Sequence, residues 1–331
     1  MRKQILRLTL LLTSACFLQG CIHEYPLEGA SGGKGEDPTA VEGYIQLNYD
    51  LNYEDLLHNI DFSTKAPSSG IHRFIVEIRN GSETIVHDVA YADDSEFSTG
   101  TFRRKLSSTL KTGRYEIAAW YDRVDSDGEP YFKADRLDHI EQVSFSTTDT
   151  IAFHCAFATD ILDLREYAGG SKTVQVAKEL EMKIPGARFQ LVATDVQTFI
   201  SQQKEALNQG DKFTVWLDLA NRDRSDFNAF SGSPLLSDKK PDYSGWMRLP
   251  FAEYDELTIA QGFIFCNEED NAIMTLSVKN SALFTVSKTN QFTFPVKRGY
   301  NTIVKGDFLT RPVDGILNVD NIWAGEIYYD I

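Results

Sequence analysis

Cysteine is scarce in this sequence, which contains only four among its 331 residues. Two of them, Cys155 and Cys266, lie inside apolar runs, where buried free thiols are common. A disulfide between these two stays open as an alternative, because two distant cysteines do not define a pairing by themselves. The low count excludes a small scaffold stapled by several disulfides.

Catalytic and nucleotide-binding motifs are absent as well. The sequence has no HExxH, no GxSxG elbow, and no Walker-type or GxGxxG loop. Its histidines show no paired spacing of the kind that holds a metal ion. The six histidines are His23, His58, His72, His87, His139 and His154. We therefore expect no enzyme, no cofactor and no metal site. One alternative stays open, namely a hydrolase that uses a pair of acidic residues on a β-sandwich, because the two residues of such a pair are distant in sequence.

Positive charge is low relative to negative charge. The chain has 33 Lys and Arg against 48 Asp and Glu, and its net charge is −15. Such an acidic protein repels nucleic acid phosphates and anionic lipid surfaces. Nucleic acid is therefore excluded as a partner.

The apolar run at the N-terminus is too short to cross a membrane. Leu8 to Leu18 supplies about ten mostly apolar residues, whereas a spanning helix needs roughly 20. Three basic residues precede it, namely Arg2, Lys3 and Arg7. Residues 1–20 are therefore predicted to be a secretory signal peptide.

The end of this signal has the pattern of a bacterial lipobox, Leu18-Gln19-Gly20-Cys21. Cleavage between Gly20 and Cys21 would make Cys21 the mature N-terminus and the lipidated residue. Two or three acyl chains would then hold the protein on a membrane, because each buried CH₂ contributes about 0.8 kcal/mol. Cys16 is a second candidate with a poorer preceding pattern, and an ordinary cleaved signal is the other alternative.

The rest of the chain reads as a spacer followed by two β-rich halves. Residues 21–40 are predicted to be a flexible linker, because they end in a stretch rich in Gly, Ser and charge. Short strands at roughly ten-residue spacing follow, with turn signals between them. The predicted fold class is all-β, with an N-terminal β-sandwich over residues 41–160 and a C-terminal β-sandwich over residues 161–331.

The clearest strand pattern lies in residues 71–79. Its apolar and polar residues alternate, so that His72, Phe74, Val76 and Ile78 face one way and Arg73, Glu77 and Arg79 the other. Asn80-Gly81 follows, which is the strongest short signal for a hairpin. Residues 113–121 alternate in the same way. One helix is expected between Asp195, as its cap, and Gly210, as its end.

Three features have two interpretations each. The tryptophans could form a glycan-stacking platform, but packing inside the protein is favoured; they are Trp120, Trp216, Trp246 and Trp323. The acidic stretch from Asp122 to Gly128 lacks the EF-hand pattern and reads as a hairpin turn rather than a calcium loop. The final strand, Trp323 to Ile331, is either the last strand of the second half or an edge that pairs with another protein.

Several strand-and-turn motifs resemble those of the fimbrillin-like surface lipoproteins of Bacteroidales, which include fimbrial anchor and minor-tip subunits. The motifs are the lipobox followed by Ile22-His23-Glu24-Tyr25-Pro26, the strand Gly113 to Asp122, the segment Ile184 to Phe189, and the segment Val296 to Thr310. Together they cover most of the mature chain.

The resemblance implies two transthyretin-like β-sandwiches in tandem, anchored by lipid to the outer membrane and exposed at the cell surface. It also implies that partners, possible fimbrial subunits among them, join by β-strand addition. The expected function is that of a fimbrial anchor or accessory adhesion subunit. A stand-alone surface lipoprotein that binds glycans or host ligands is the alternative.

Overall fold

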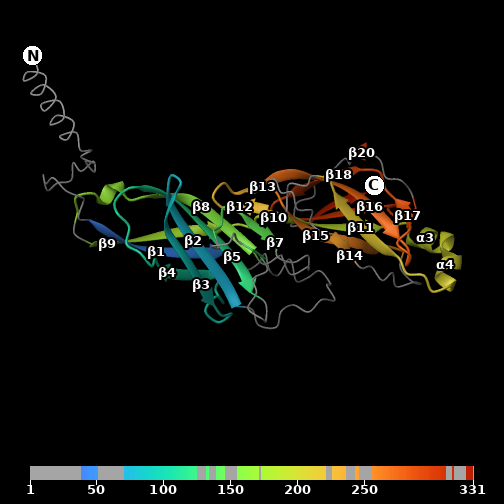
Figure 1. Cartoon of the computed structure of the whole chain (residues 1–331), viewed down its shortest axis with the longest axis horizontal. Helices are drawn as coiled ribbons and strands as arrows, with labels where there is room; N and C mark the ends of the chain where they lie inside the picture. Colours follow the sequence, from blue (N-terminus) through green and yellow to red (C-terminus); the bar gives the residue numbers. More distant parts are fainter. Residues whose placement is uncertain are drawn as a thin grey trace, which may run out of the picture. The chain divides into compact units, whose positions relative to one another are not determined.

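Figure 1 shows the computed structural model of the chain. The residues it describes are 39–50, 71–124, 132–133, 139–145, 155–170, 173–220, 226–235, 243–245, 255–310, 315–316 and 326–330. The predicted signal peptide with Gly20 and Cys21, nearly all of the predicted linker, and residues 125–128 of the acidic turn lie outside the described residues.

Strands dominate the structure, so the predicted all-β class is confirmed. Among the described residues, the helical elements are α3 (Val196–Gln202), α4 (Lys204–Asn208) and a 3₁₀ turn, η1 (Arg165–Tyr167). Within the described part of the chain, no helix is long and apolar enough to cross a membrane. The chain divides into a small unit (residues 1–43, 108–114 and 163–176) and a large unit with all other residues. The domain boundary at residues 160 and 161 stays a prediction.

Two sheets carry most of the first half of the chain. One has the order β3-β2-β5-β8, formed by β2 (Ile71–Asn80), β3 (Glu83–Ala92), β5 (Arg114–Val124) and β8 (Cys155–Asp163). The other has the order β4-β1-β9, formed by β1 (Ala40–Tyr49), β4 (Thr101–Lys105) and β9 (Thr173–Met182). The predicted strand over residues 71–79 and the hairpin at Asn80-Gly81 are confirmed.

Aromatic side chains pack on the even-numbered face of β2. Phe74 stacks on Phe102 with ring centroids 4.0 Å apart, and it contacts Phe97 and Tyr121 at 5.2 and 5.3 Å. Phe74, Phe97 and Tyr121 are almost completely buried. Aromatic pairs of this kind contribute about 0.5–1.5 kcal/mol each beyond their burial. The alternating pattern of residues 71–79 therefore encodes one wall of this core.

The remaining strands form three further sheets. The first has the order β13-β12-β7-β6, with β6 (Phe132–Lys133), β7 (Val143–Phe145), β12 (Asp226–Asn228) and β13 (Ser233–Leu235). The second has the order β15-β10-β19-β21, with β10 (Gly186–Ala193), β15 (Leu257–Phe265), β19 (Asn301–Gly306) and β21 (Glu326–Asp330). The third has the order β14-β11-β16-β18-β20, with β17 (Thr285–Lys288) beside β16. Its other strands are β11 (Thr214–Leu219), β14 (Tyr243–Gly245), β16 (Glu269–Lys279), β18 (Phe292–Lys297) and β20 (Gly315–Ile316).

The C-terminal strand β21 pairs with the protein's own sheet. It runs parallel to β19, with Asn301 opposite Glu326 and Lys305 opposite Asp330. Of the two interpretations of the final strand, pairing within the second half is therefore confirmed for residues 326–330. The beginning of the predicted strand, residues 323–325, lies outside the described residues.

The helical segment differs from the prediction of one capped helix. It is broken at Gln203 into α3 and α4, and Asp195 makes no side-chain capping bond to α3. The Asp195 carboxylate instead accepts hydrogen bonds from the backbone N–H groups of Leu309 and Thr310, at 3.0 and 2.6 Å, and from the Thr310 hydroxyl at 2.7 Å. The cap prediction for Asp195 was wrong, because a long-range contact takes the oxygens that a cap would use.

Substitution of Gly186, at the start of β10, tests the close packing of β10 against β15. A Cβ atom there would lie 2.1 Å from the Ile264 carbonyl oxygen and 2.6 Å from the Phe263 ring. We predict that Gly186→Ala lowers the free energy of unfolding by about 1–3 kcal/mol or more, because the opposing backbone cannot move aside cheaply. Urea unfolding measures this change.

The matched control is Gly81→Asn in the β2–β3 hairpin. Gly81 has φ +60° and open space around its Cα, and Asn tolerates this conformation. The control should unfold close to wild type. Equal stability of Gly186→Ala and wild type would contradict the packing at β10.

Candidate functional site

Strand β3 forms a free edge of its sheet. It is ten residues long and pairs with β2 alone among the described strands. Ile85 and Tyr91 on this strand expose 36% and 57% of their surfaces. An edge of this length presents a row of unpaired backbone N–H and C=O groups to any extended segment that approaches.

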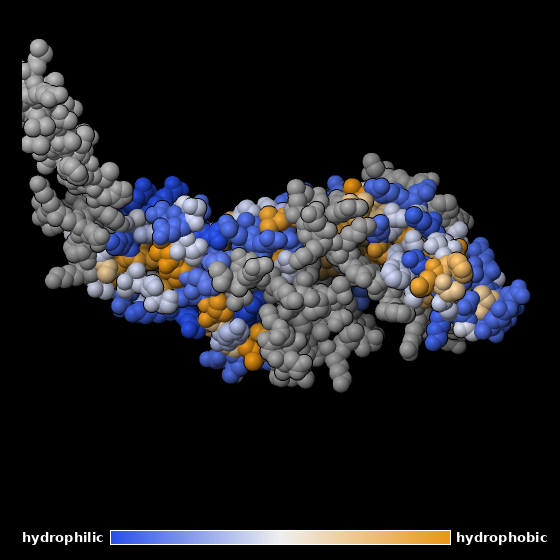
Figure 2. Space-filling view, in the orientation of Figure 1, coloured by the Kyte–Doolittle hydropathy of each residue, from blue (hydrophilic) through white to orange (hydrophobic). Residues whose placement is uncertain are grey.

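A shallow apolar groove lies beside this edge, between the sheet of β3 and that of β4. Its cavity volume is about 20 Å³, which is room for about one water molecule. The groove is lined by Ile45, Leu47, Phe74, Val76, Asp88, Ala90, Phe102, Arg104, Lys105 and Leu106. Figure 2 shows apolar surface over the strands labelled β1, β3 and β4 in Figure 1. The groove supplies an apolar floor for side chains but does not enclose a ligand.

The opposite face of the same sheet buries charged residues. Arg73 on β2 lies directly across from Asp122 on β5, and its Nε and Nη2 donate to the two Asp122 oxygens at 2.8 and 2.6 Å. Trp120 donates its indole N–H to Asp122 at 3.2 Å and is completely buried. Packing, rather than a glycan platform, is therefore confirmed for Trp120. Asp122 is a buried ion-pair partner and not a residue of an exposed turn.

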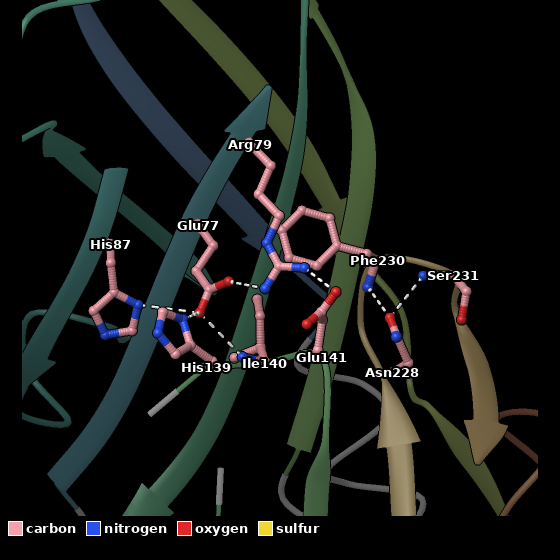
Figure 3. A network of polar contacts seen from close by, with 9 residues as sticks. All are labelled: Glu77, Arg79, His87, His139, Ile140, Glu141, Asn228, Phe230 and Ser231. Atoms are coloured by element: carbon pink, nitrogen blue, oxygen red, sulfur yellow. Dashed lines mark hydrogen bonds and ion pairs between the residues drawn. The ribbon is translucent and has the colours of Figure 1, made fainter. Parts of the chain in front are cut away.

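Glu77 collects four donors on this buried face (Figure 3). Its Oε1 atom lies 3.1 Å from His87 Nδ1 and 2.8 Å from His139 Nδ1, and it accepts the Ile140 backbone N–H at 3.1 Å. Its Oε2 atom accepts a hydrogen bond from Arg79 Nη2 at 2.8 Å. The Glu77 side chain has no exposed surface. These donors compensate the cost of burying a carboxylate.

The residues around Arg79 hold it against Glu77. Its guanidinium lies 4.0 Å from the centre of the Phe230 ring and also forms an ion pair with Glu141. Phe230 and Ser231 donate their backbone N–H groups to Asn228 Oδ1, at 2.9 and 3.0 Å, which fixes the turn after β12 (Figure 3). Arg79, which lies on β2, is therefore held in place by the segment that follows β12.

Glu77, His87 and His139 form a cluster with the donor atoms of a metal site. One oxygen of Glu77 and one nitrogen of each histidine all lie within 4.8 Å of one another. The side chains of His87 and His139 keep 26% and 25% of their surface exposed. Paired spacing in the sequence does not reveal this cluster, because His139 is far from the other two residues in the chain.

Cys155 and Cys266 are both free and buried. Burial raises the pKa of the Cys155 thiol well above its usual range, and the nearby Asp122 carboxylate adds to the rise. A raised pKa keeps the thiol protonated and unreactive. The free-thiol prediction is therefore confirmed, and the disulfide alternative was wrong.

The family of the chain follows from its sequence. Residues 38–331 match the family of unknown function DUF6562. The chain belongs to this family. A search of curated proteins found no match.

Solved structures similar to this family member include two with fimbrial names. The fimbrial anchor protein Mfa2 from Porphyromonas gingivalis is 13% identical, with a TM-score of 0.44 over 76% of this chain and 82% of that chain. A fimbrial assembly protein from Parabacteroides distasonis is 9% identical, with a TM-score of 0.35 over 80% of this chain and 90% of that chain. The sequence motifs predicted relatives of this kind.

Substitution of Glu77 tests how much its buried polar contacts contribute to stability. We predict that Glu77→Gln lowers the free energy of unfolding by about 2–3 kcal/mol, because Arg79 and the two histidines would lose the buried carboxylate that they share. Chemical unfolding of both proteins in the same buffer measures the difference.

Glu141→Gln is the matched control, since it removes the other carboxylate beside Arg79. The Glu141 side chain is 58% exposed, and loss of an exposed ion pair should cost at most about 1 kcal/mol. Equal effects of the two substitutions would show that Glu77 does not carry the network.

Proposed function

We propose that this protein is a lipid-anchored outer-membrane surface protein that serves as a fimbrial anchor or accessory adhesion subunit and holds its partner by β-strand addition at β3. The lipobox ending at Cys21 supports the anchor, and the strand-and-turn motifs of the sequence support the fimbrial type of partner. The free edge of β3 beside an apolar groove is the structural observation that carries the proposal.

The edge of β3 has the chemistry that strand addition requires. A ten-residue strand extends about 34 Å, so a partner strand could form a long ladder of main-chain hydrogen bonds along it. The apolar residues of the groove, Phe102 among them, would contact alternate side chains of the incoming strand. Main-chain bonds supply the affinity in this mode, and side-chain contacts supply the specificity.

A hydrogen bond crosses the groove beside this edge. The Ser107 backbone N–H, just after β4, donates to Asp88 Oδ2 on β3 at 2.8 Å. This contact joins β3 to the residues that follow β4. A partner strand beside β3 would therefore meet an edge whose position is fixed at its middle.

Lipid attachment has a direct test. We predict that the wild-type protein carries added acyl mass and stays with the membrane, while Cys21→Ala is unmodified and released. The change removes the thiol that would accept the lipid, and intact mass together with protease shaving of whole cells measures both results. An unmodified Cys21 in the wild type would contradict the anchor.

Strand addition has a separate test at the edge itself. We predict that Ile85→Lys, in protein that keeps its anchor, reduces co-purification with fimbrial subunits from detergent-extracted membranes at least tenfold. A lysine on an edge strand hinders pairing with another strand, and Ile85 is exposed enough that the fold should tolerate it.

Ile161→Lys is the matched control. Ile161 lies on β8, at the opposite edge of the same sheet, and its exposure of 37% almost equals that of Ile85. The control should co-purify like wild type. Equal retention of both variants would remove β3 as the site of addition.

A further inference from the structure

The Glu77 carboxylate has hydrogen-bond donors on both oxygens without the histidine pair beside it. Arg79 and the Ile140 N–H already supply one donor to each of its oxygens. Two imidazole rings nevertheless direct their Nδ1 atoms to the same Oε1 atom, with ring centroids 5.0 Å apart. We propose that Glu77, His87 and His139 form a structural binding site for a divalent transition metal ion, with zinc as the fitting ion.

The spacing of the three donor atoms fits such an ion. Zinc binds imidazole nitrogen and carboxylate oxygen at about 2.0–2.2 Å in tetrahedral geometry, which places ligand atoms about 3.4 Å apart. The Oε1–Nδ1 distances are 2.8 and 3.1 Å, and all three atoms lie within 4.8 Å of one another. Small rotations of the two rings would open the space for the ion between them.

Binding also requires a change of tautomer in the histidines. Each Nδ1 atom would offer its lone pair to the ion, and the proton of a neutral ring would reside on Nε2 instead. Both rings are about one quarter exposed, so water can reach the cluster and supply the fourth ligand. Two imidazoles and one carboxylate favour zinc over calcium or magnesium, which prefer oxygen ligands alone.

The surroundings of Glu77 would orient it as a ligand. Arg79 would keep its hydrogen bond to Oε2, and Ile140 would keep its N–H directed at Oε1. Contacts of this outer kind fix ligand geometry, and their loss typically changes metal affinity about 10–100-fold. Phe230 and Glu141 in turn hold Arg79.

The ion would join three segments that are distant in the sequence. Glu77 lies on β2, His87 on the edge strand β3, and His139 in the segment before β7. A metal bridge would fasten the edge strand to the segment that lies across its sheet. This inference does not depend on the proposed function, because it rests on the buried face of the sheet and not on the groove.

Zinc binding to the mature chain tests the inference. All proteins carry Cys21→Ala, so that the N-terminal thiol cannot act as a ligand, and are stripped with a chelator before titration with Zn²⁺ in a calorimeter. We expect one zinc per chain, confirmed by elemental analysis, and a higher melting temperature with zinc. His87→Gln and His139→Gln should each weaken binding at least tenfold, since each removes a ligand.

His72→Gln is the matched control, because His72 bonds to Tyr121 and Asp94 on the other face of the same strand. It should bind zinc like the parent protein. Cobalt bound to the parent protein should also give visible d–d absorption that His87→Gln loses. The inference is overturned if the parent protein binds no zinc, or if the two ligand variants bind as tightly as the control. Should one ligand variant not fold, the other variant and the cobalt spectrum decide.

Discussion

Burial of both faces of strand β2 is the constraint on which this structure depends. Its even-numbered residues pack in an aromatic core, and its odd-numbered residues Arg73, Glu77 and Arg79 are buried on the opposite face. Charges in that position are tolerated only when each one is paired and hydrogen-bonded. Asp122 compensates Arg73, and Arg79 with two histidines compensates Glu77. The pairing then requires the segments at residues 139–141 and 226–230 to lie across the sheet.

The two proposals use different sides of the same edge strand. The even-numbered residues Asp88 and Ala90 of β3 line the apolar groove, while His87 turns to the buried face and contacts Glu77. A partner strand would add along the backbone of β3, and a metal ion would hold that backbone from one side. An edge that is fixed in this way loses little conformational freedom when a partner binds, which favours binding.

Much of the fold could be predicted from local patterns, whereas the candidate sites could not. Period-two alternation predicted β2, and Asn80-Gly81 predicted its hairpin. The register between β2 and β3 could not be predicted from the hairpin alone. A shift between Ile78 and Arg79 moves the pairing by one residue, and it brings His87, rather than Val86, opposite Glu77. His139 joins them through tertiary packing alone, and Asp195 bonds to Leu309 and Thr310 for the same reason. Charged residues on an alternating strand also gave no sign that their face would be covered.

The central claim, that β3 receives a strand from a partner, is tested most directly by photo-crosslinking on intact cells that display fimbriae. A photoreactive phenylalanine analogue replaces Ile85 in one protein and Ile161, at the opposite edge of the sheet, in the other. We predict that the probe at residue 85 crosslinks to a fimbrial subunit and that the probe at residue 161 does not. Absence of a crosslink at residue 85, or equal crosslinking from both edges, would contradict it.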